Sequence, residues 1–550
     1  MVLNSTMVLP TNLSEDHTAL TAQNLPFQIR NSLETTVTCV GSEYNRTCLY
    51  NNLYYKDKKF VVLTVRGNHL PFLLVRIGIR VGTRLKQGID PNIISDCIPK
   101  IVEFNSIADL EHFVRETAKP RVLSSVTVYF KQPWHFNIGH ALFDGLYPGY
   151  MALTHFPPRH LLPFRSLIDM DNIECGICWS EDVSSRFSGL GIIKEKILKN
   201  MSVHSWFAFD ELVMGNGDMC QLCIQPNFQL AGGVELDGSR LFRDRMYKQH
   251  GLDILLQRRK NSAEKRDPRK PLKAYFIHNK AFSVADEKEI KDSIIEINKY
   301  TDLYLKKRNR IDKLEWPLVH VAYVNYRNIK AKNKEFSHFQ STNIDSRIPT
   351  YELVETDFMA QLRLLSDMDI HITGPGTGQM YQTFLSDGSV TINLGKLKNS
   401  SYQRSTTTYA SFMEQYMTAG APYIKGLYYP INERRNGIKK KELVTLIQRA
   451  AKLITDGFRL PVNSRENLAA DGQIFIEMCE KDVTFCREVT VRAPLRETSC
   501  FDMWAEDMVH EVRQWSSQGF IAGKRRIRCP LNHTLLRQLR QKYNIVHETT

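Results

Sequence analysis

The sequence has no apolar run long enough to cross a membrane as a helix. Such a helix needs about 18 or more uninterrupted apolar residues, whereas the run Leu70–Val75 ends at Arg76. The first residues, Met1–Thr6, also lack the basic stretch followed by an apolar stretch that marks a signal peptide. We therefore predict no membrane span, and either a cytosolic protein or a lumenal domain whose anchor is missing from this sequence.

Internal repeats and low-complexity tracts are absent as well. The 550 residues are 42% hydrophobic and 24% charged, which is close to average globular usage and excludes wholesale disorder. This length is roughly three to four times that of a typical domain, so a single small binding module is excluded.

Lys and Arg outnumber Asp and Glu by 73 to 59, a net charge of +14. That excess favours anionic partners such as nucleotide diphosphates, acidic glycans, phospholipid surfaces or nucleic acid. The most strongly charged stretch, Leu255–Lys270, lacks interleaved aromatic residues. We interpret it as a connection between domains and predict no nucleic-acid partner.

The cysteines and glycosylation sequons favour the lumen of the Golgi or endoplasmic reticulum over the cytoplasm. Eleven cysteines leave at least one thiol unpaired within the chain. Several lie in close pairs, which are Cys39/Cys48, Cys175/Cys178, Cys220/Cys223 and Cys479/Cys486. The Asn-X-Ser/Thr sequons begin at Asn4, Asn12, Asn45, Asn200, Asn399 and Asn532. Cys175, Cys178, Cys220 and Cys223 have the number and local spacing of zinc ligands, although two disulfides that hold a loop are the favoured interpretation.

Alternating strand and helix patterns predict an α/β fold. Strands are predicted at 60–65, 126–130, 274–277, 319–324, 369–373 and 390–394, and helices at 101–114, 351–366 and 443–454. The predicted organisation is a polar stem (1–38), a first Rossmann-like domain (39–265), a second Rossmann-like domain (266–430), an amphipathic helix that packs back (431–464) and a cysteine-containing extension (465–550).

A glycine-rich loop, Thr373-Gly-Pro-Gly-Thr-Gly378, follows one of these predicted strands and precedes a short helix that contains Gln379. Glycines let the backbone turn sharply and approach a ligand closely. The N–H groups at the start of a helix attract anions. The loop predicts a diphosphate site, although a tight turn that needs glycine for its geometry alone stays open.

A second polar group follows the strand at 126–130. Asn137, His140 and Asp144 have the spacing i, i+3 and i+7, which places them on one face of a helix. Ile138, Leu142 and Leu146 would face the core. A carboxylate beside a histidine can accept a proton from a hydroxyl nucleophile. The alternative is a helix start capped by Asn137, with His140 in a structural role.

Two Asp-X-Asp pairs, Asp169/Asp171 and Asp367/Asp369, are candidate ligands for Mn²⁺ or Mg²⁺. Asp369 opens a predicted buried strand, which is a poor place for a solvated metal. The sequence therefore predicts no metal ligands and no required cofactor, with a metal ion at either pair as the less favoured alternative.

The motif Asn137-X-X-His140-X-X-X-Asp144 resembles the amino-terminal motif of glycosyltransferase family 61, which includes the EGF-domain O-GlcNAc transferase and plant xylosyl- and arabinosyltransferases. Other segments are similar to that family, namely Arg46–Tyr55, Tyr323–Arg327, Phe358–Gln361, Ser366–Ile370 and Gly376–Gly378. The family commonly has a histidine where this chain has Pro375. The tail after about residue 465 has no counterpart.

The resemblance implies a GT-B architecture, in which two Rossmann-like domains face each other across a cleft and a C-terminal helix crosses back. It also implies transfer of a hexose or pentose from a nucleotide sugar, with inversion of the anomeric centre. The expected nucleotide is UDP. Gly376, Thr377, Gly378 and Gln379 would bind the diphosphate together with Arg327. Asp144, or His140 supported by Asp144 and Asn137, would deprotonate the acceptor.

The sequence thus predicts a glycosyltransferase whose partners are a nucleotide-sugar donor and a glycan or glycoprotein acceptor. The alternatives are a metal-dependent transferase that uses an Asp-X-Asp pair, and a non-catalytic protein that binds glycans or nucleotides.

Overall fold

The structure is a computed structural model. It describes residues 32–41, 46–71, 73–78, 94–132, 135, 137–170, 179–215, 238–252, 266–280, 282–306, 314–331, 356–374, 376–395, 421–430, 433, 436–460, 470–482, 520–522, 525–527 and 532–544.

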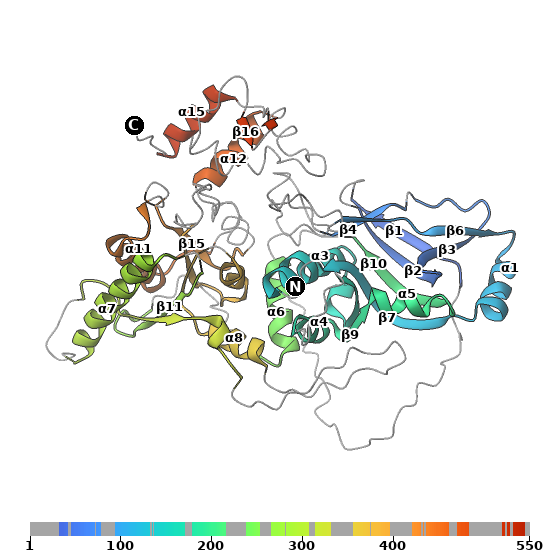
Figure 1. Cartoon of the computed structure of the whole chain (residues 1–550), viewed down its shortest axis with the longest axis horizontal. Helices are drawn as coiled ribbons and strands as arrows, with labels where there is room; N and C mark the ends of the chain where they lie inside the picture. Colours follow the sequence, from blue (N-terminus) through green and yellow to red (C-terminus); the bar gives the residue numbers. More distant parts are fainter. Residues whose placement is uncertain are drawn as a thin grey trace, which may run out of the picture.

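Two large sheets with flanking helices make the fold α/β, as the sequence predicts (Figure 1). The first sheet has the order β6-β3-β2-β10-β7-β8-β9, and β1 also pairs with β2. Its strands are β1 (Thr36–Val40), β2 (Thr47–Lys56), β3 (Lys59–Val65), β6 (Lys100–Phe104), β7 (Arg121–Gln132), β8 (Phe164–Met170), β9 (Gly189–Lys194) and β10 (Phe207–Met214). Strand β2 runs antiparallel to its neighbours, whereas β10, β7, β8 and β9 are mutually parallel.

Helices cover both faces of the first sheet. The helical segments of this half, residues 32–252, are α1 (Ile107–His112), η1 (Phe113–Ala118), α2 (Ile138–His140), η2 (Ala141–Leu146), α3 (Tyr147–Thr154), η3 (Arg159–Leu161), α4 (Trp179–Ser188), α5 (Glu195–Met201) and α6 (Gly238–Gln249). Successive side chains of a strand point to opposite faces. In β7, Val128 and Phe130 accordingly pack in the core beneath α3, α4 and α6, whereas Tyr129 packs in the core beneath α5. A small antiparallel pair, β4 (Val75–Gly78) and β5 (Ile94–Cys97), completes that second core.

The second sheet is entirely parallel, with the order β12-β11-β13-β14-β15. Its strands are β11 (Leu272–Ile277), β12 (Val319–Val324), β13 (Ile370–Thr373), β14 (Val390–Asn393) and β15 (Lys425–Tyr428). The helical segments of this half, residues 266–460, are α7 (Val284–Lys306), η5 (Tyr326–Asn328), α8 (Asp357–Ser366), α9 (Thr377–Met380), η6 (Tyr381–Phe384) and α11 (Lys440–Asp456). Every residue of β13 and β14 is buried, as is typical of central parallel strands.

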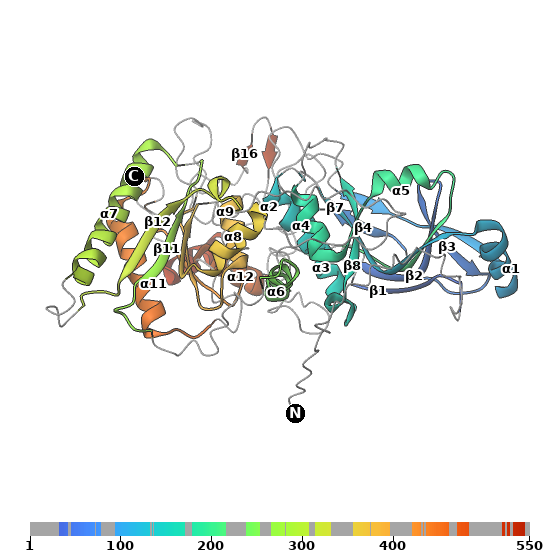
Figure 2. The ribbon, with the colours of Figure 1, turned by 90° about the horizontal axis from the view of Figure 1, so that it is seen from below.

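The two halves share one hydrophobic core. A single cluster of buried residues contains Phe143 and Phe242 of the first half together with Phe358 and Phe384 of the second. Helix α6 lies between the two sheets, with α8 beside it (Figure 2). The halves are therefore joined by side chains that pack around α6 and α8.

The structure corrects the predicted start of one helix. Residues 101–104 belong to strand β6 and not to a helix, because they pair in parallel register with β3; the helix starts only at Ile107, where Ser106 accepts a hydrogen bond from the Asp109 N–H at the N-cap. Helix α11 buries its apolar face against the second sheet and α7. The C-terminal helix that the resemblance implies to cross back stays a prediction.

The C-terminal region contains α12 (Ala470–Lys481), α15 (His533–Lys542) and a short hairpin of β16 (Phe520–Ala522) and β17 (Arg525–Ile527). An ion pair of 2.6 Å between Glu477 and Lys542 joins the two helices. Among the described residues, no helix is both long enough and apolar enough to cross a membrane.

One predicted cysteine pair is a disulfide. Cys39 on β1 is bonded to Cys48 on β2, where the two residues are direct cross-strand partners. Cys97 is a free thiol. The predicted cluster of Cys175, Cys178, Cys220 and Cys223 lies outside the described residues, as does the polar stem up to residue 31.

Candidate functional site

The candidate site lies where the carboxyl ends of the parallel strands of the two sheets meet. In open α/β sheets, ligands bind outside the carboxyl ends of the strands, at the point where the strand order reverses. In the second sheet this point lies between β11 and β13, and in the first sheet it lies between β7 and β10. The glycine-rich loop follows β13, and the segment that carries Asn137 follows β7. The sequence-predicted groups therefore occupy both switch points.

Asn137 and Thr377 connect these two points directly. Asn137 is the N-cap of α2, and its Oδ1 accepts a hydrogen bond of 3.1 Å from the Gly139 N–H. The same oxygen accepts a hydrogen bond of 3.3 Å from the Thr377 hydroxyl. The resemblance implied a cleft between the two domains, whereas here these two side chains are in contact. Helices α2 and α9 lie side by side between the sheets (Figure 2).

Three glycines lie at or beside this contact. A Cβ atom at Gly139 would come within 2.8 Å of the Thr377 hydroxyl, so only glycine allows this approach of α2 to α9. Gly376, the N-cap of α9, has φ 128° and ψ −162°, a region that essentially only glycine adopts. A Cβ atom at Gly376 would meet nothing within 4 Å, so its need for glycine is conformational and the space beside it is open. Gly378 packs against the Ile277 side chain at the end of β11, and a Cβ atom placed on Gly378 would lie 3.1 Å from that side chain.

The segment after His140 does not continue as a regular α-helix. Residues Ala141–Leu146 form π-helical turns, and Asp144 lies within them. These turns interrupt the α-helical spacing from which the sequence placed Asn137, His140 and Asp144 on one face, and that shared face stays a prediction. The core side of the prediction is confirmed, because Ile138, Leu142 and Leu146 are buried. π-Helical turns inside helices are frequent at functional sites.

A buried polar network lies beneath the glycine-rich loop. Gln379 is fully buried, and its Nε2 donates a hydrogen bond of 3.2 Å to Asn393 at the end of β14. Its Oε1 is buried without a hydrogen-bond partner among the described residues. Nearby, the His371 ring lies between the hydroxyls of Tyr326 and Thr391, and burial lowers the pKa of His371 to about 3. This histidine is therefore neutral near pH 7 and carries no charge toward an anion.

Arg327 lies in η5, directly after β12, where its side chain is exposed. The Asn325 side chain caps this turn by accepting a hydrogen bond of 3.0 Å from the Arg327 N–H. The position is at the carboxyl edge of the second sheet, the same edge as the glycine-rich loop.

Sequence reasoning missed three polar residues at this edge, His278, Asn279 and Lys280, which follow β11. Their signal was available, since they come directly after a buried strand of a parallel sheet. The Asn279 amide nitrogen would lie 3.0 Å from a Cβ atom placed on Gly374, so this segment contacts the glycine-rich loop. The His278 Nδ1 forms a hydrogen bond of 2.9 Å with the Tyr323 hydroxyl. Lys280 is exposed and adds a cation near the switch point.

The Asp-X-Asp pairs lie elsewhere. Asp367 and Asp369 precede β13, at the end of the strand opposite to the glycine-rich loop, where they pair with Lys273 at 2.6 Å and with Arg266 at 2.5 Å. Asp169 pairs with Lys131 at 3.6 Å, and Asp171 lies outside the described residues. Within the part of the chain that the structure describes, no group of three or more His, Cys, Asp or Glu side chains is arranged to hold a metal ion.

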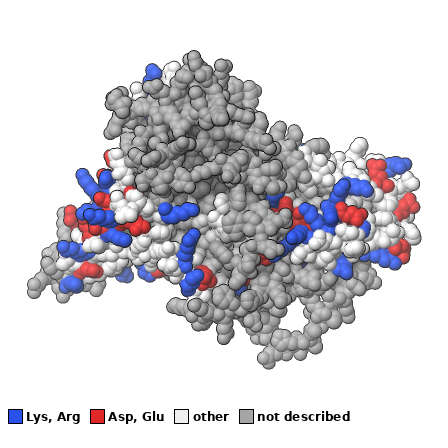
Figure 3. Space-filling view, in the orientation of Figure 1, with Lys and Arg blue, Asp and Glu red and all other residues white. Residues whose placement is uncertain are grey.

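On the face of the molecule shown in Figure 3, Lys and Arg alternate with Asp and Glu over the described residues of both halves. Nucleic-acid-binding domains gather their basic residues in a patch or stripe. The described residues of this face show no such stripe.

Comparison of the chain with models of protein families and with curated proteins gave no match.

Proposed function

We propose that this protein is an inverting, nucleotide-sugar-dependent glycosyltransferase of GT-B type, with the donor bound by the second half and the acceptor by the first. The observation that carries the proposal is the contact between Asn137 and Thr377. It brings the switch points of two parallel sheets to one place, and each switch point is where an α/β sheet binds its ligands. A transfer reaction needs its two substrates bound next to each other, which two adjacent switch points can provide.

The second half supplies the groups for the donor diphosphate. The backbone N–H groups of Gly376, Thr377 and Gly378 lie before and within the first turn of a helix, where such groups have no partner inside the helix. Gly376 leaves open space beside the backbone. Arg327 would neutralise the diphosphate charge and Gln379 would support the loop from below. Arginine forms charge-assisted hydrogen bonds with phosphate oxygens.

The first half supplies the base. Asp144, or His140 assisted by Asp144, would accept the proton of an acceptor hydroxyl as that oxygen attacks the anomeric carbon. The bond between the anomeric carbon and the diphosphate oxygen breaks on the opposite face, which inverts the configuration. The N–H groups of the loop and Arg327 stabilise the charge of the leaving diphosphate.

The ion pairs of Asp367 and Asp369 favour this proposal over a metal-dependent transferase that would use them. Both carboxylates form ion pairs, with Lys273 and Arg266, at the end of β13 opposite to the glycine-rich loop. Activity that persists in excess EDTA would support the metal-independent mechanism, and activity abolished by EDTA and restored by Mn²⁺ would replace it.

The disulfide between Cys39 and Cys48 supports a location in an oxidising compartment. We propose the lumen of the Golgi or endoplasmic reticulum, with a glycan or glycoprotein as acceptor. Two sequons fall on described, exposed positions, at Asn200 in α5 and Asn532 at the start of α15.

The test is a thermal-shift panel of nucleotide sugars. A ligand at 100 times its Kd stabilises the folded state by about 2.7 kcal/mol, which raises the melting temperature. We expect at least one UDP-sugar to raise it in the wild type but not in Gly376→Ala, whose left-handed backbone a side chain would strain. Gly67→Ala is the matched control, because Gly67 also has a positive φ (92°) and open space around it, but lies in the turn after β3. Loss of the shift in both variants, or no shift with any nucleotide sugar, would contradict the proposed donor site.

A further inference from the structure

Helix α6 contains a buried arginine that the proposed transfer does not use. Arg243 is fully buried, although it belongs to the first half of the chain. Its Nη1 donates a hydrogen bond of 2.9 Å to the Leu385 carbonyl and pairs with Asp387 Oδ1 at 2.7 Å. Its Nε and Nη2 bind the neighbouring Asp244 at 3.0 and 2.9 Å. The guanidinium also lies over the Tyr423 ring, 4.1 Å from its centroid.

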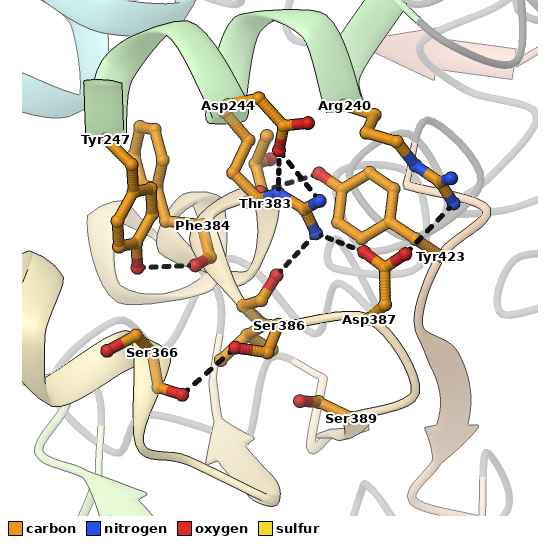
Figure 4. Close-up of polar contacts among 12 residues, drawn as sticks. Arg240, Asp244, Tyr247, Ser366, Thr383, Phe384, Ser386, Asp387, Ser389 and Tyr423 are labelled. Atoms are coloured by element: carbon orange, nitrogen blue, oxygen red, sulfur yellow. Dashed lines mark hydrogen bonds and ion pairs between the residues drawn. The ribbon is translucent and has the colours of Figure 1, made fainter. Parts of the chain in front are cut away.

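Two of these contacts reach the second half: the hydrogen bond to Leu385 is directional, whereas Asp387 Oδ1 is held by charge without a hydrogen bond. A buried charge is tolerated only when it is paired and its hydrogen-bonding capacity is met. The guanidinium presents a rigid fork of donors, so its hydrogen bond fixes the position of the Leu385 carbonyl relative to α6, and the ion pair holds Asp387 close by. Arg240, one turn earlier on α6, reaches the other oxygen of Asp387 at 3.5 Å (Figure 4).

Three side chains hold three successive carbonyls at the end of η6. The Tyr423 hydroxyl donates to the Thr383 carbonyl at 2.6 Å, and the Tyr247 hydroxyl lies 2.8 Å from the Phe384 carbonyl. Arg243 binds the next carbonyl, that of Leu385. The final carbonyls of a helical segment have no partner within it. These side chains therefore anchor the C-terminal end of the segment 377–384 (Figure 4).

The same segment begins at the candidate site. It runs without interruption from Thr377, through α9 and η6, to Phe384. Eight helical residues span only about 12 Å. A displacement at the anchored end therefore moves the end that contacts Asn137. Tyr381 and Gln382 within the segment are buried and hydrogen-bonded to the second half, to Gln361 and Thr391, so the segment is held along its length.

We propose that Arg243 is a positioning residue of the transferase site, which acts through residues 377–384 to hold Thr377 and the glycine-rich loop against Asn137. The effect of Arg243 on sugar transfer rests on the proposed function. The effect of Arg243 on residues 377–384 can be measured without any substrate.

Arg245 on the same helix provides a matched control. It is also buried, and its guanidinium donates to the carbonyls of Phe187 at 2.8 Å, Ser188 at 3.0 Å and His160 at 3.2 Å, all in the first half. Arg245→Met thus removes a buried guanidinium from α6 without touching the segment 377–384.

The experiment compares Arg243→Met, Arg243→Lys, Tyr423→Phe and Arg245→Met with the wild type by amide hydrogen exchange, by UDP affinity and by transfer kinetics. We expect faster exchange of the amides of 377–384 in Arg243→Met, a smaller effect in Arg243→Lys, and no effect confined to this segment in Arg245→Met. Because displacements of about 1 Å can lower rates about a hundredfold, kcat/KM should fall by up to that factor in Arg243→Met and far less in Arg245→Met.

Tyr423→Phe keeps the ion pair between Arg243 and Asp387 but loses the hydrogen bond to the Thr383 carbonyl. This variant tests the anchoring of 377–384 if Arg243→Met does not fold, and faster exchange of 377–384 in it supports the proposal. Unchanged exchange of 377–384 in Arg243→Lys and Tyr423→Phe would overturn it, as would equal losses in Arg243→Met and Arg245→Met. A wild type that binds no UDP and transfers no sugar would contradict the proposed function, and the exchange data would still decide whether Arg243 positions the segment.

Discussion

Gly139 of α2 lies so close to Thr377 of α9 that an added Cβ atom would stand 2.8 Å from the threonine hydroxyl oxygen. The two residues are far apart in sequence, yet Gly139 packs directly against the Thr377 and Met380 side chains of α9. This contact joins the segments that follow β7 and β13, where the proposed function places the two substrates of a transfer reaction.

Gly139→Ala should therefore disturb the contact between the halves. Alanine improves helix propensity by about 1 kcal/mol, but overpacking costs typically about 1–3 kcal/mol, so we expect a net loss of stability and a lower kcat/KM. Thr377→Ala removes the hydroxyl with which the new methyl group collides. In a double-mutant cycle, Gly139→Ala should be less harmful in the Thr377→Ala background. Equal effects in both backgrounds, measured by thermal unfolding, would show that the two residues do not constrain each other.

The Asn137 side-chain oxygen accepts two hydrogen bonds, from the Gly139 N–H and from the Thr377 hydroxyl. Two substitutions at this position should show how much these bonds contribute to stability. Loss of an N-cap costs about 1 kcal/mol, so Asn137→Ala should lower the unfolding free energy by at least that amount, with the Thr377 bond lost as well. Asn137→Asp keeps an oxygen that can accept from Gly139 and Thr377. We expect it to retain most of the stability in chemical denaturation. An aspartate variant as unstable as the alanine variant would speak against both contacts.

The sequence predicted the strands that flank the site because their residues carry the signal themselves. β11, β12, β13 and β14 are short apolar runs, each bounded by polar residues, glycine or proline, and the structure places them within two residues of the predicted bounds. Residues 101–104 have the same i, i+3 spacing as the helix that follows, and only the partner strand β3 decides that they are extended. Strand β3 is distant in sequence, so the local spacing of residues 101–104 carries no information about this pairing.

Helix α6 could not be assigned a role from its sequence. Residues 238–249 contain three arginines and a lysine, a composition typical of a solvated surface, yet Arg243 and Arg245 are buried. Their partners, Asp387 and the carbonyls of Phe187 and Ser188, lie 57 or more positions away along the chain. The π-helical turns around Asp144 were equally hidden, since hydrophobic spacing over so short a segment does not separate α- from π-turns.

Two buried histidines should make the protein less stable in mild acid. Burial lowers the pKa of His250 to about 4 and that of His371 to about 3, against 6.5 for the exposed side chain. The unfolded chain therefore binds more protons than the folded one between pH 6.5 and these values, so stability is complete above pH 6.5 and falls as the pH decreases through this window.

Each histidine contributes at most about 1.4 kcal/mol per pH unit. We expect His250→Leu to reduce the difference between unfolding free energies measured at pH 7 and pH 5. A variant with the same pH dependence as the wild type would show that His250 titrates normally. His320, which is exposed on β12, provides the control substitution.

Arg327 should act on donor affinity before it acts on turnover. Its exposed guanidinium lies at the carboxyl edge of the second sheet, where it would neutralise diphosphate charge. We expect Arg327→Ala to raise KM for the nucleotide sugar with a smaller change in kcat, because this contact is made in both the ground and transition states. Arg115→Ala, an exposed arginine of η1 in the first half, is the matched control. A change confined to kcat would place Arg327 elsewhere in the mechanism.

The most direct measurement is sugar transfer by Asp144→Asn, alongside UDP binding by the same variant. The exchange of a carboxylate for an amide removes the proposed base at nearly constant size. We expect unchanged UDP affinity and melting temperature, with transfer reduced by about 10²- to 10⁴-fold, as is usual when general-base catalysis is lost. Wild-type turnover in Asp144→Asn would remove the assigned base, and a wild-type protein that neither binds UDP nor transfers sugar from any nucleotide donor would contradict the glycosyltransferase account as a whole.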